Sequence, residues 1–183
     1  MMPELSLNIL DVVQNSVRAG ATLASVEITA DTAKDRLTVV ISDDGCGMTP
    51  EQVERVTDPF FTTRTTRKVG LGIPFFKMAA EITGGAFRID SRVGEGTVTT
   101  AEFVLSSIDR MPLGDIAGTM TALIGTSPEM DFVLSVAMDG QGFSADTREF
   151  RAVLEGISLA EPEVLAYISD YINENMSEYA PNL

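Results

Sequence analysis

The stretch ISDDGCGM, residues 41–48, decides the fold that this sequence predicts. It begins within a segment, residues 37–42, whose pattern is typical of a strand, and it holds an acidic pair and two glycines. Gly45 and Gly47 permit backbone conformations and close approaches that a Cβ atom would block. An Asp-Gly pair is also a strong signal for a hairpin turn, so a ligand site and a turn both stay open for this stretch alone.

A second polar pair lies upstream, in a segment whose apolar residues recur at helical spacing over residues 4–19. Asp11 and Asn15 stand four residues apart, so their side chains project from one face over successive turns. An amide oxygen is a suitable hard ligand for a divalent cation. Polar residues on an amphipathic helix also form ordinary solvated faces, and this alternative stays open for the pair taken alone.

A third stretch lies downstream, where residues 57–68 hold five threonines and three cations without periodicity. We interpret this segment as an exposed, mobile loop. It leads into Gly70-Leu71-Gly72 and then into a helical pattern at 73–82. Backbone N–H groups and the dipole at a helix start favour bound phosphate, whereas turn glycines in a solvated loop are the alternative.

In this order and spacing, the three stretches resemble the N box, G1 box and G2 box of the GHKL ATPases, the superfamily of gyrase, Hsp90, histidine kinases and MutL. The segment QNSVRAGAT, residues 14–22, closely resembles the corresponding MutL segment. The resemblance covers about residues 4–105 and implies an α/β sandwich with the Bergerat-type ATP-binding fold. Its sheet is expected to be mixed and mostly antiparallel, with helices on one face. The whole chain is also similar to small ATP-binding proteins found beside iron-only hydrogenase genes.

The resemblance also implies a role for each matching residue, with ATP and Mg²⁺ as cofactors. Asp43 is expected to accept a hydrogen bond from the adenine amino group, and Asn15 to ligate Mg²⁺. Asp11 takes the catalytic position, where the family often has a Glu, and its side chain is one methylene shorter. The other expected nucleotide contacts are Gly45, Gly47, Met48, Phe60, Thr62, Thr63, Arg64, Lys68, Gly70, Leu71, Gly72 and Thr97.

Charge and pattern change near residue 108, where we predict a boundary. Residues 1–108 hold 14 acidic and 10 basic side chains, and residues 109–183 hold 13 acidic and three basic ones. The first part is the expected ATP-binding domain, and the second is a small acidic α/β extension of unassigned role. Periodicity predicts further helices at 50–56, 115–125, 147–156 and 161–176, strands at 24–30, 37–42, 86–91, 97–105 and 131–138, and a turn at 139–142.

Composition excludes several classes of function. The net charge of −14 leaves no basic face for nucleic acid, which needs phosphate-neutralising cations. The single Cys46 and the absence of His exclude an internal disulfide and the usual zinc sites. No apolar run approaches the ~18 residues of a membrane span, so we expect no membrane partner and a cytoplasmic location.

The function that we expect is a stand-alone, histidine-kinase-like module that binds Mg-ATP and phosphorylates an unidentified partner protein in trans. The basic, hydroxyl-rich loop and the absence of an acceptor His in this chain favour it. The alternative is a nucleotide-gated protein-binding module with slow or no hydrolysis, favoured by Asp11 in place of Glu. In that case the acidic extension is a docking surface or a homodimer contact. A MutL-like, DNA-linked ATPase is disfavoured by the charge.

Overall fold

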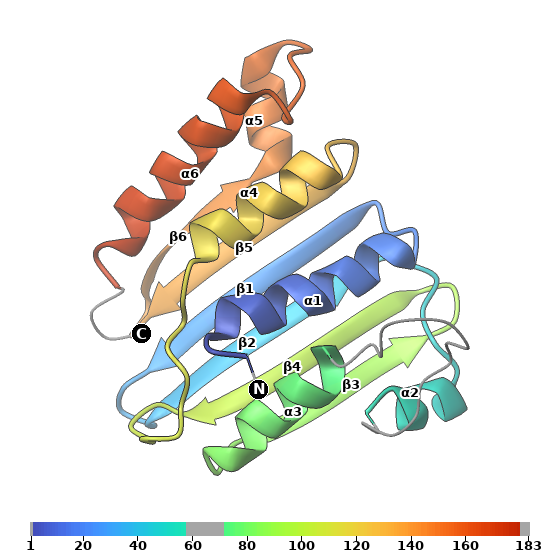
Figure 1. Ribbon diagram of the computed structural model, residues 1–183, viewed down its shortest axis with the longest axis vertical. Helices are drawn as coiled ribbons and strands as arrows, with labels where there is room; N and C mark the ends of the chain where they lie inside the picture. Colours follow the sequence, from blue (N-terminus) through green and yellow to red (C-terminus); the bar gives the residue numbers. More distant parts are fainter. Residues whose placement is uncertain (1, 58–71, 180–183) are drawn as a thin grey trace.

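The computed structural model describes residues 2–57 and 72–179, and within them the chain forms one six-stranded sheet in the order β3-β4-β2-β1-β5-β6 (Figure 1). The strands are β1 (Leu23–Asp31), β2 (Arg36–Asp43), β3 (Ala86–Arg92), β4 (Gly96–Val104), β5 (Asp131–Met138) and β6 (Gln141–Asp146). The helices are α1 (Leu5–Arg18), α2 (Pro50–Val56), α3 (Gly72–Ile82), α4 (Ile116–Thr126), α5 (Thr147–Leu154) and α6 (Pro162–Met176).

Strand pairing makes the sheet mixed and mostly antiparallel. β1 pairs with β2, β2 with β4, β3 with β4, and β5 with β6, all antiparallel. β5 runs parallel to β1 along its whole length, and the α4 helix lies between β4 and β5 in the chain. This topology confirms the fold class expected from the sequence.

Side-chain alternation places the core on one face of the sheet. In β1, Val26 and Ile28 are fully buried while Glu27 and Thr29 between and beyond them are exposed, as expected for a strand with one covered face. Helices α1, α3 and α4 lie side by side over that face, and α6 packs against α4 (Figure 1). The helical layer thus covers one face, as the resemblance implied.

The two parts predicted on either side of residue 108 share this sheet and its core. The backbone N–H of Leu5 donates to the carbonyl of Pro112 at 3.0 Å, and that of Ser6 donates to Leu113 at 2.8 Å. Residues from α1, β1, α4, β5 and α6 belong to one continuous apolar cluster. Residues 109–179 therefore add β5 and β6 to the sheet that the first part of the chain forms, while the domain boundary near residue 108 stays a prediction.

The expected helices and strands all occur within about two residues of their predicted ends. The capping box of α2 is present, because Thr49 Oγ1 accepts from the Gln52 N–H and the Gln52 side chain accepts from the Thr49 N–H. Strand β6 was not predicted: the turn expected at 139–142 ends at Gly140, and pairing with β5 begins at Gln141. Gly142 and the polar residues of this strand give weak β propensity, and cross-strand pairing overrides it.

Candidate functional site

Asp43 lies at the end of β2 and is tied to α1. Its Oδ2 accepts a hydrogen bond from Ser16 Oγ at 2.6 Å, and its Oδ1 accepts one from the Gly45 N–H at 2.9 Å. An ionised carboxylate has about four acceptor positions, and these two bonds use half of them. The half-buried side chain is therefore fixed in direction and still able to accept hydrogen bonds from a ligand.

The neighbouring Asp44 is engaged in a different way. Its carboxylate accepts hydrogen bonds from the backbone N–H groups of Thr22 and Leu23 at 2.7 and 2.9 Å, and from the Thr22 hydroxyl. The hydrogen bond from the Thr22 side chain is the main reason that the pKa of Asp44 lies below its ordinary value. Asp44 thus anchors the start of β1, and of the two acids only Asp43 is held toward α1.

The loop after Asp43 packs closely on the turn between β3 and β4. Gly47 has φ +65°, and a methyl group there would lie 1.8 Å from the carbonyl oxygen of Arg92. The Gly94 N–H donates to the carbonyl of Cys46 at 2.8 Å from the same turn. The glycine at position 47 is therefore required both by its backbone conformation and by the lack of space.

A second network holds Met48 and Thr97 beside this loop. The Met48 N–H donates to Ser91 Oγ at 2.8 Å, and the hydroxyls of Ser91 and Thr97 lie 2.8 Å apart. In the strand register Thr97 is the direct partner of Asp43. The structure therefore brings together three predicted residues: Ser91 links Met48 to Thr97, and Thr97 lies opposite Asp43 in the sheet.

Asp11 and Asn15 both lie on α1, and Asp11 is next to the start of α3. A methyl group at Gly72 would lie 2.7 Å from Asp11 Cβ and 3.4 Å from its Oδ2, so the carboxylate is adjacent to the first residue of α3. Burial raises the pKa of the Asp11 carboxyl, and the nearby charge of Arg18 opposes this effect. The Asn15 amide oxygen accepts from Arg18 Nη1 at 3.2 Å and its side chain is half-buried.

The remaining predicted contacts lie outside the described residues. They are Phe60, Thr62, Thr63, Arg64, Lys68, Gly70 and Leu71, and their roles stay predictions. Two residues that the sequence analysis missed, Ser16 and Ser91, complete the described network. Ser16 carried a signal, since it is a polar side chain four residues after Val12 on the apolar face of α1. Ser91 carried none, because its hydrogen bond with the Met48 N–H joins positions 43 apart in the sequence.

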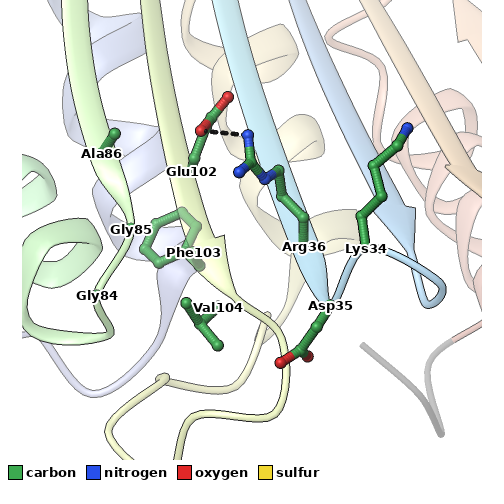
Figure 2. Close-up of a pocket in the computed structure, with 9 residues that line it drawn as sticks. All are labelled: Lys34, Asp35, Arg36, Gly84, Gly85, Ala86, Glu102, Phe103 and Val104. Carbon is green, nitrogen blue, oxygen red and sulfur yellow. Dashed lines mark hydrogen bonds and ion pairs between the residues drawn. The ribbon is translucent and has the colours of Figure 1, made fainter.

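A pocket of about 230 Å³ lies at the opposite end of the sheet, where β2 begins and β4 ends (Figure 2). Its charged residues include Arg36 and Glu102, whose side chains form an ion pair at 2.8 Å. None of the residues that line it comes from the three predicted boxes. We therefore place the candidate site at the Asp43 end of β2.

The sequence and the fold were compared with known proteins. Residues 3–107 match the model of the HATPase_c family, described as histidine kinase-, DNA gyrase B-, and HSP90-like ATPase. The chain is 30% identical over 93 residues to the sensor histidine kinase ZraS of Salmonella typhimurium, which covers 50% of this chain and 20% of that protein. It is 30% identical over 96 residues to the histidine protein kinase DivJ of Caulobacter vibrioides, covering 50% and 16%.

The chain thus spans about a fifth or less of the length of the curated relatives it matches. The fold is similar to that of the Aquifex aeolicus MutL ATPase domain complexed with ADP, with a TM-score of 0.51, 16% identity, and coverage of 85% of this chain and 70% of that one. In the described part of this chain, no helix is long and apolar enough to span a bilayer. The family match covers more than half of the chain, which therefore belongs to the histidine kinase-, DNA gyrase B- and HSP90-like ATPases.

Proposed function

We propose that this chain binds Mg-ATP between α1, the end of β2 and the start of α3, and transfers the terminal phosphoryl group to a partner protein. One observation carries the proposal. Helix α1 holds Asp43 through Ser16, carries Asn15 at the preceding position, and places Asp11, somewhat more than one turn earlier, beside Gly72. Family membership supports ATP binding, and this geometry supports its location.

Asp43 is suited to select adenine. The adenine base carries an amino donor where guanine carries a carbonyl acceptor, so a fixed carboxylate attracts the first and repels the second. The two hydrogen bonds from Ser16 and Gly45 hold the carboxylate in place before the ligand arrives. A preset acceptor loses little freedom on binding, which favours both affinity and discrimination.

Asn15 is suited to bind the cation that accompanies the phosphates. Among the residues that the structure describes, no group of three or more acidic, His or Cys side chains lies close enough to hold an ion alone. A cation at Asn15 would take its other ligands from phosphate oxygens and water, which is the usual situation for Mg²⁺. Bound there, Mg²⁺ would supply neutralisation of the phosphate charge.

Asp11 is suited to accept a proton during transfer. Burial shifts the pKa of its carboxyl upward, which is the direction that a general base requires. With a hydroxyl acceptor, the acceptor oxygen forms a new bond to the γ-phosphorus, and the bond from that phosphorus to the β–γ bridging oxygen breaks. Asp11 takes the hydroxyl proton, and ADP leaves. The dipole and first N–H groups of α3 favour the phosphate charge beside it.

A nucleotide-gated binding module is the second candidate. Asp11 carries one methylene fewer than Glu, and its Cβ packs directly on Gly72, so the carboxylate stays close to α1 and α3. A base with short reach favours slow turnover or none. In that case ATP would change the affinity for a partner, and pull-downs with and without Mg-ATP would recover different amounts of it.

Transfer of label from γ-labelled ATP tests the proposal. The pure 183-residue chain is incubated with labelled ATP, then with added cytoplasmic extract, and Asn15→Ala serves as the control. We expect label on a protein of the extract, with the wild type only, and its stability in acid will distinguish a phosphohydroxyl from a phosphohistidine. Label released only as free phosphate, or retained entirely in ATP, would contradict the proposed transfer.

A further inference from the structure

An apolar groove of about 910 Å³ lies between α5 and α6, next to the edge strand β6. These two helices lie at the β6 edge of the sheet, the edge farthest from α3, with α4, β5 and β1 between them and the candidate ATP site (Figure 1). No residue that lines this α5–α6 groove belongs to that site. The groove therefore calls for a role that ATP binding does not provide.

The floor and walls of the groove are aromatic and aliphatic. The Phe150 ring packs edge-on against Tyr167 and Tyr171, with centroids 6.3 and 5.9 Å apart. Beside this cluster, Val153, Ile157 and Tyr167 are 82%, 56% and 62% exposed. Three large apolar side chains exposed together in a concave surface are typical of an interaction site rather than of an ordinary solvated face.

The charges at the groove are negative. Glu149, Glu161 and Glu163 line it together with these apolar side chains and are exposed. The two arginines of α5 are engaged elsewhere, since Arg148 binds Asp146 at 2.6 Å and Arg151 binds Asp131 at 2.9 Å. Residues 109–183 carry 13 acidic and three basic side chains in all, so the surrounding surface is also negative.

We propose that the α5–α6 groove binds a helical segment of a partner protein, with large apolar side chains on one face and Lys or Arg beside them. Apolar anchors at i, i+3, i+4 and i+7 are the usual way in which a helix fills such a groove. The flanking cations complement the three glutamates and speed association. A second copy of this chain, with net charge −14, would meet like charge here, and so would an anionic ligand.

Fluorescence anisotropy with a synthetic peptide tests this proposal on the 183-residue chain. The probe is a labelled peptide of about 15 residues, with Leu and Phe on one helical face and Lys elsewhere. One comparison peptide has the same composition with the apolar residues scattered, and a second has Glu in place of Lys. We expect the amphipathic basic peptide to bind at about 0.15 M salt, and each comparison peptide to bind at least ~tenfold more weakly.

Variants of the chain locate the binding. Tyr167→Ala and Val153→Ser are expected to weaken binding of the probe peptide, by about tenfold for the aromatic residue. Ile108→Ala removes a 98% exposed apolar side chain elsewhere and is expected to leave this binding unchanged. Glu161→Lys is expected to weaken binding several-fold more than Glu27→Lys, the same charge change on the open face of the sheet. Thermal melting checks that every variant is folded.

Several results would overturn the proposal. They are equal binding of the scattered peptide, equal binding by Tyr167→Ala and Val153→Ser, tighter binding of the Glu peptide, or a dimer in sedimentation that Tyr167→Ala dissociates. The Asp43→Asn variant is expected to bind the peptide as the wild type does. Peptide binding and ATP binding can therefore fail separately.

Discussion

Replacing Asp43 by Asn is the sharpest single test of the nucleotide site. The backbone N–H of Gly45 cannot turn away, so the amide oxygen of the variant must keep facing it. The amide nitrogen then takes the place of Oδ2, and the Ser16 hydroxyl can rotate to accept from it. The local fold is kept, while N–H donors replace acceptor positions on the side that remains available to a ligand.

The size of the expected effect follows from the charge that is lost. A hydrogen bond to a charged group contributes about 1.5–3 kcal/mol, and about 1.4 kcal/mol corresponds to tenfold in affinity. We therefore expect the dissociation constant for ATP to rise by roughly 10- to 100-fold. Since the carboxylate also repels guanine, the preference for ATP over GTP should largely disappear.

Asp35→Asn is the matched control. Asp35 precedes β2 as Asp43 ends it, and its carboxylate likewise accepts from a serine hydroxyl and a backbone N–H, those of Ser106 at 2.6 and 2.8 Å. Isothermal titration with ATP and GTP, together with thermal melting, compares the two variants. If Asp43→Asn is folded and keeps both the wild-type affinity for ATP and its preference over GTP, the assignment of the adenine site is refuted.

Three further predictions concern stability and the cation. Because burial raises the pKa of Asp11 above its ordinary 3.8, the folded state binds that proton more tightly than the unfolded state, and stability falls as pH rises through this range. Asp11→Asn should therefore melt at a higher temperature than the wild type at pH 7, and the difference should shrink below about pH 4. An equal or lower melting temperature of the variant at pH 7 would contradict the destabilising effect of the buried charge. Gly47→Ala should lower the free energy of unfolding in urea by about 2–5 kcal/mol, because the methyl group adds left-handed backbone strain and overlaps Arg92. Gly20→Ala is the control, since Gly20 has φ +70° and no atom within 4 Å of the added methyl group, and it should cost only about 1–2 kcal/mol. Equal costs for the two variants would refute the close approach of Gly47 to Arg92. Asn15→Ala should weaken ATP binding in the presence of Mg²⁺ by at least about tenfold and change Mg²⁺-free binding little, as titrations with and without chelator will show.

Local patterns in the sequence predicted most of the fold. Alternation marked β1, β2 and β5, and helical spacing marked α1 and α3, because these elements bury one regular face. β6 was missed, since Gly142 and its polar neighbours form a strand only through pairing with β5. The parallel pairing of β5 with β1 was also beyond the sequence, because it joins residues more than 100 positions apart.

The candidate site was predictable to a different extent. Asp43, Asn15 and Gly72 stood out through the order and spacing of the three boxes. Ser16 was visible only as a polar residue on an apolar helical face, and its hydrogen bond to Asp43 joins segments 27 positions apart. The α5–α6 groove could not be predicted, because the exposure of Val153 and Tyr167 depends on how two helices pack.

Backbone amide shifts during titration of the full chain with Mg-ATP test the central claim most directly. We predict shifts at residues 45–48, along α1 from Asp11 to Asn15, and at Gly72, with the α5–α6 groove unaffected. The same titration of Asp43→Asn should produce these shifts only at higher ATP concentration. Shifts concentrated instead at residues 34–36 and 84–86, around the pocket of Figure 2, would contradict the account and move the nucleotide to the other end of the sheet.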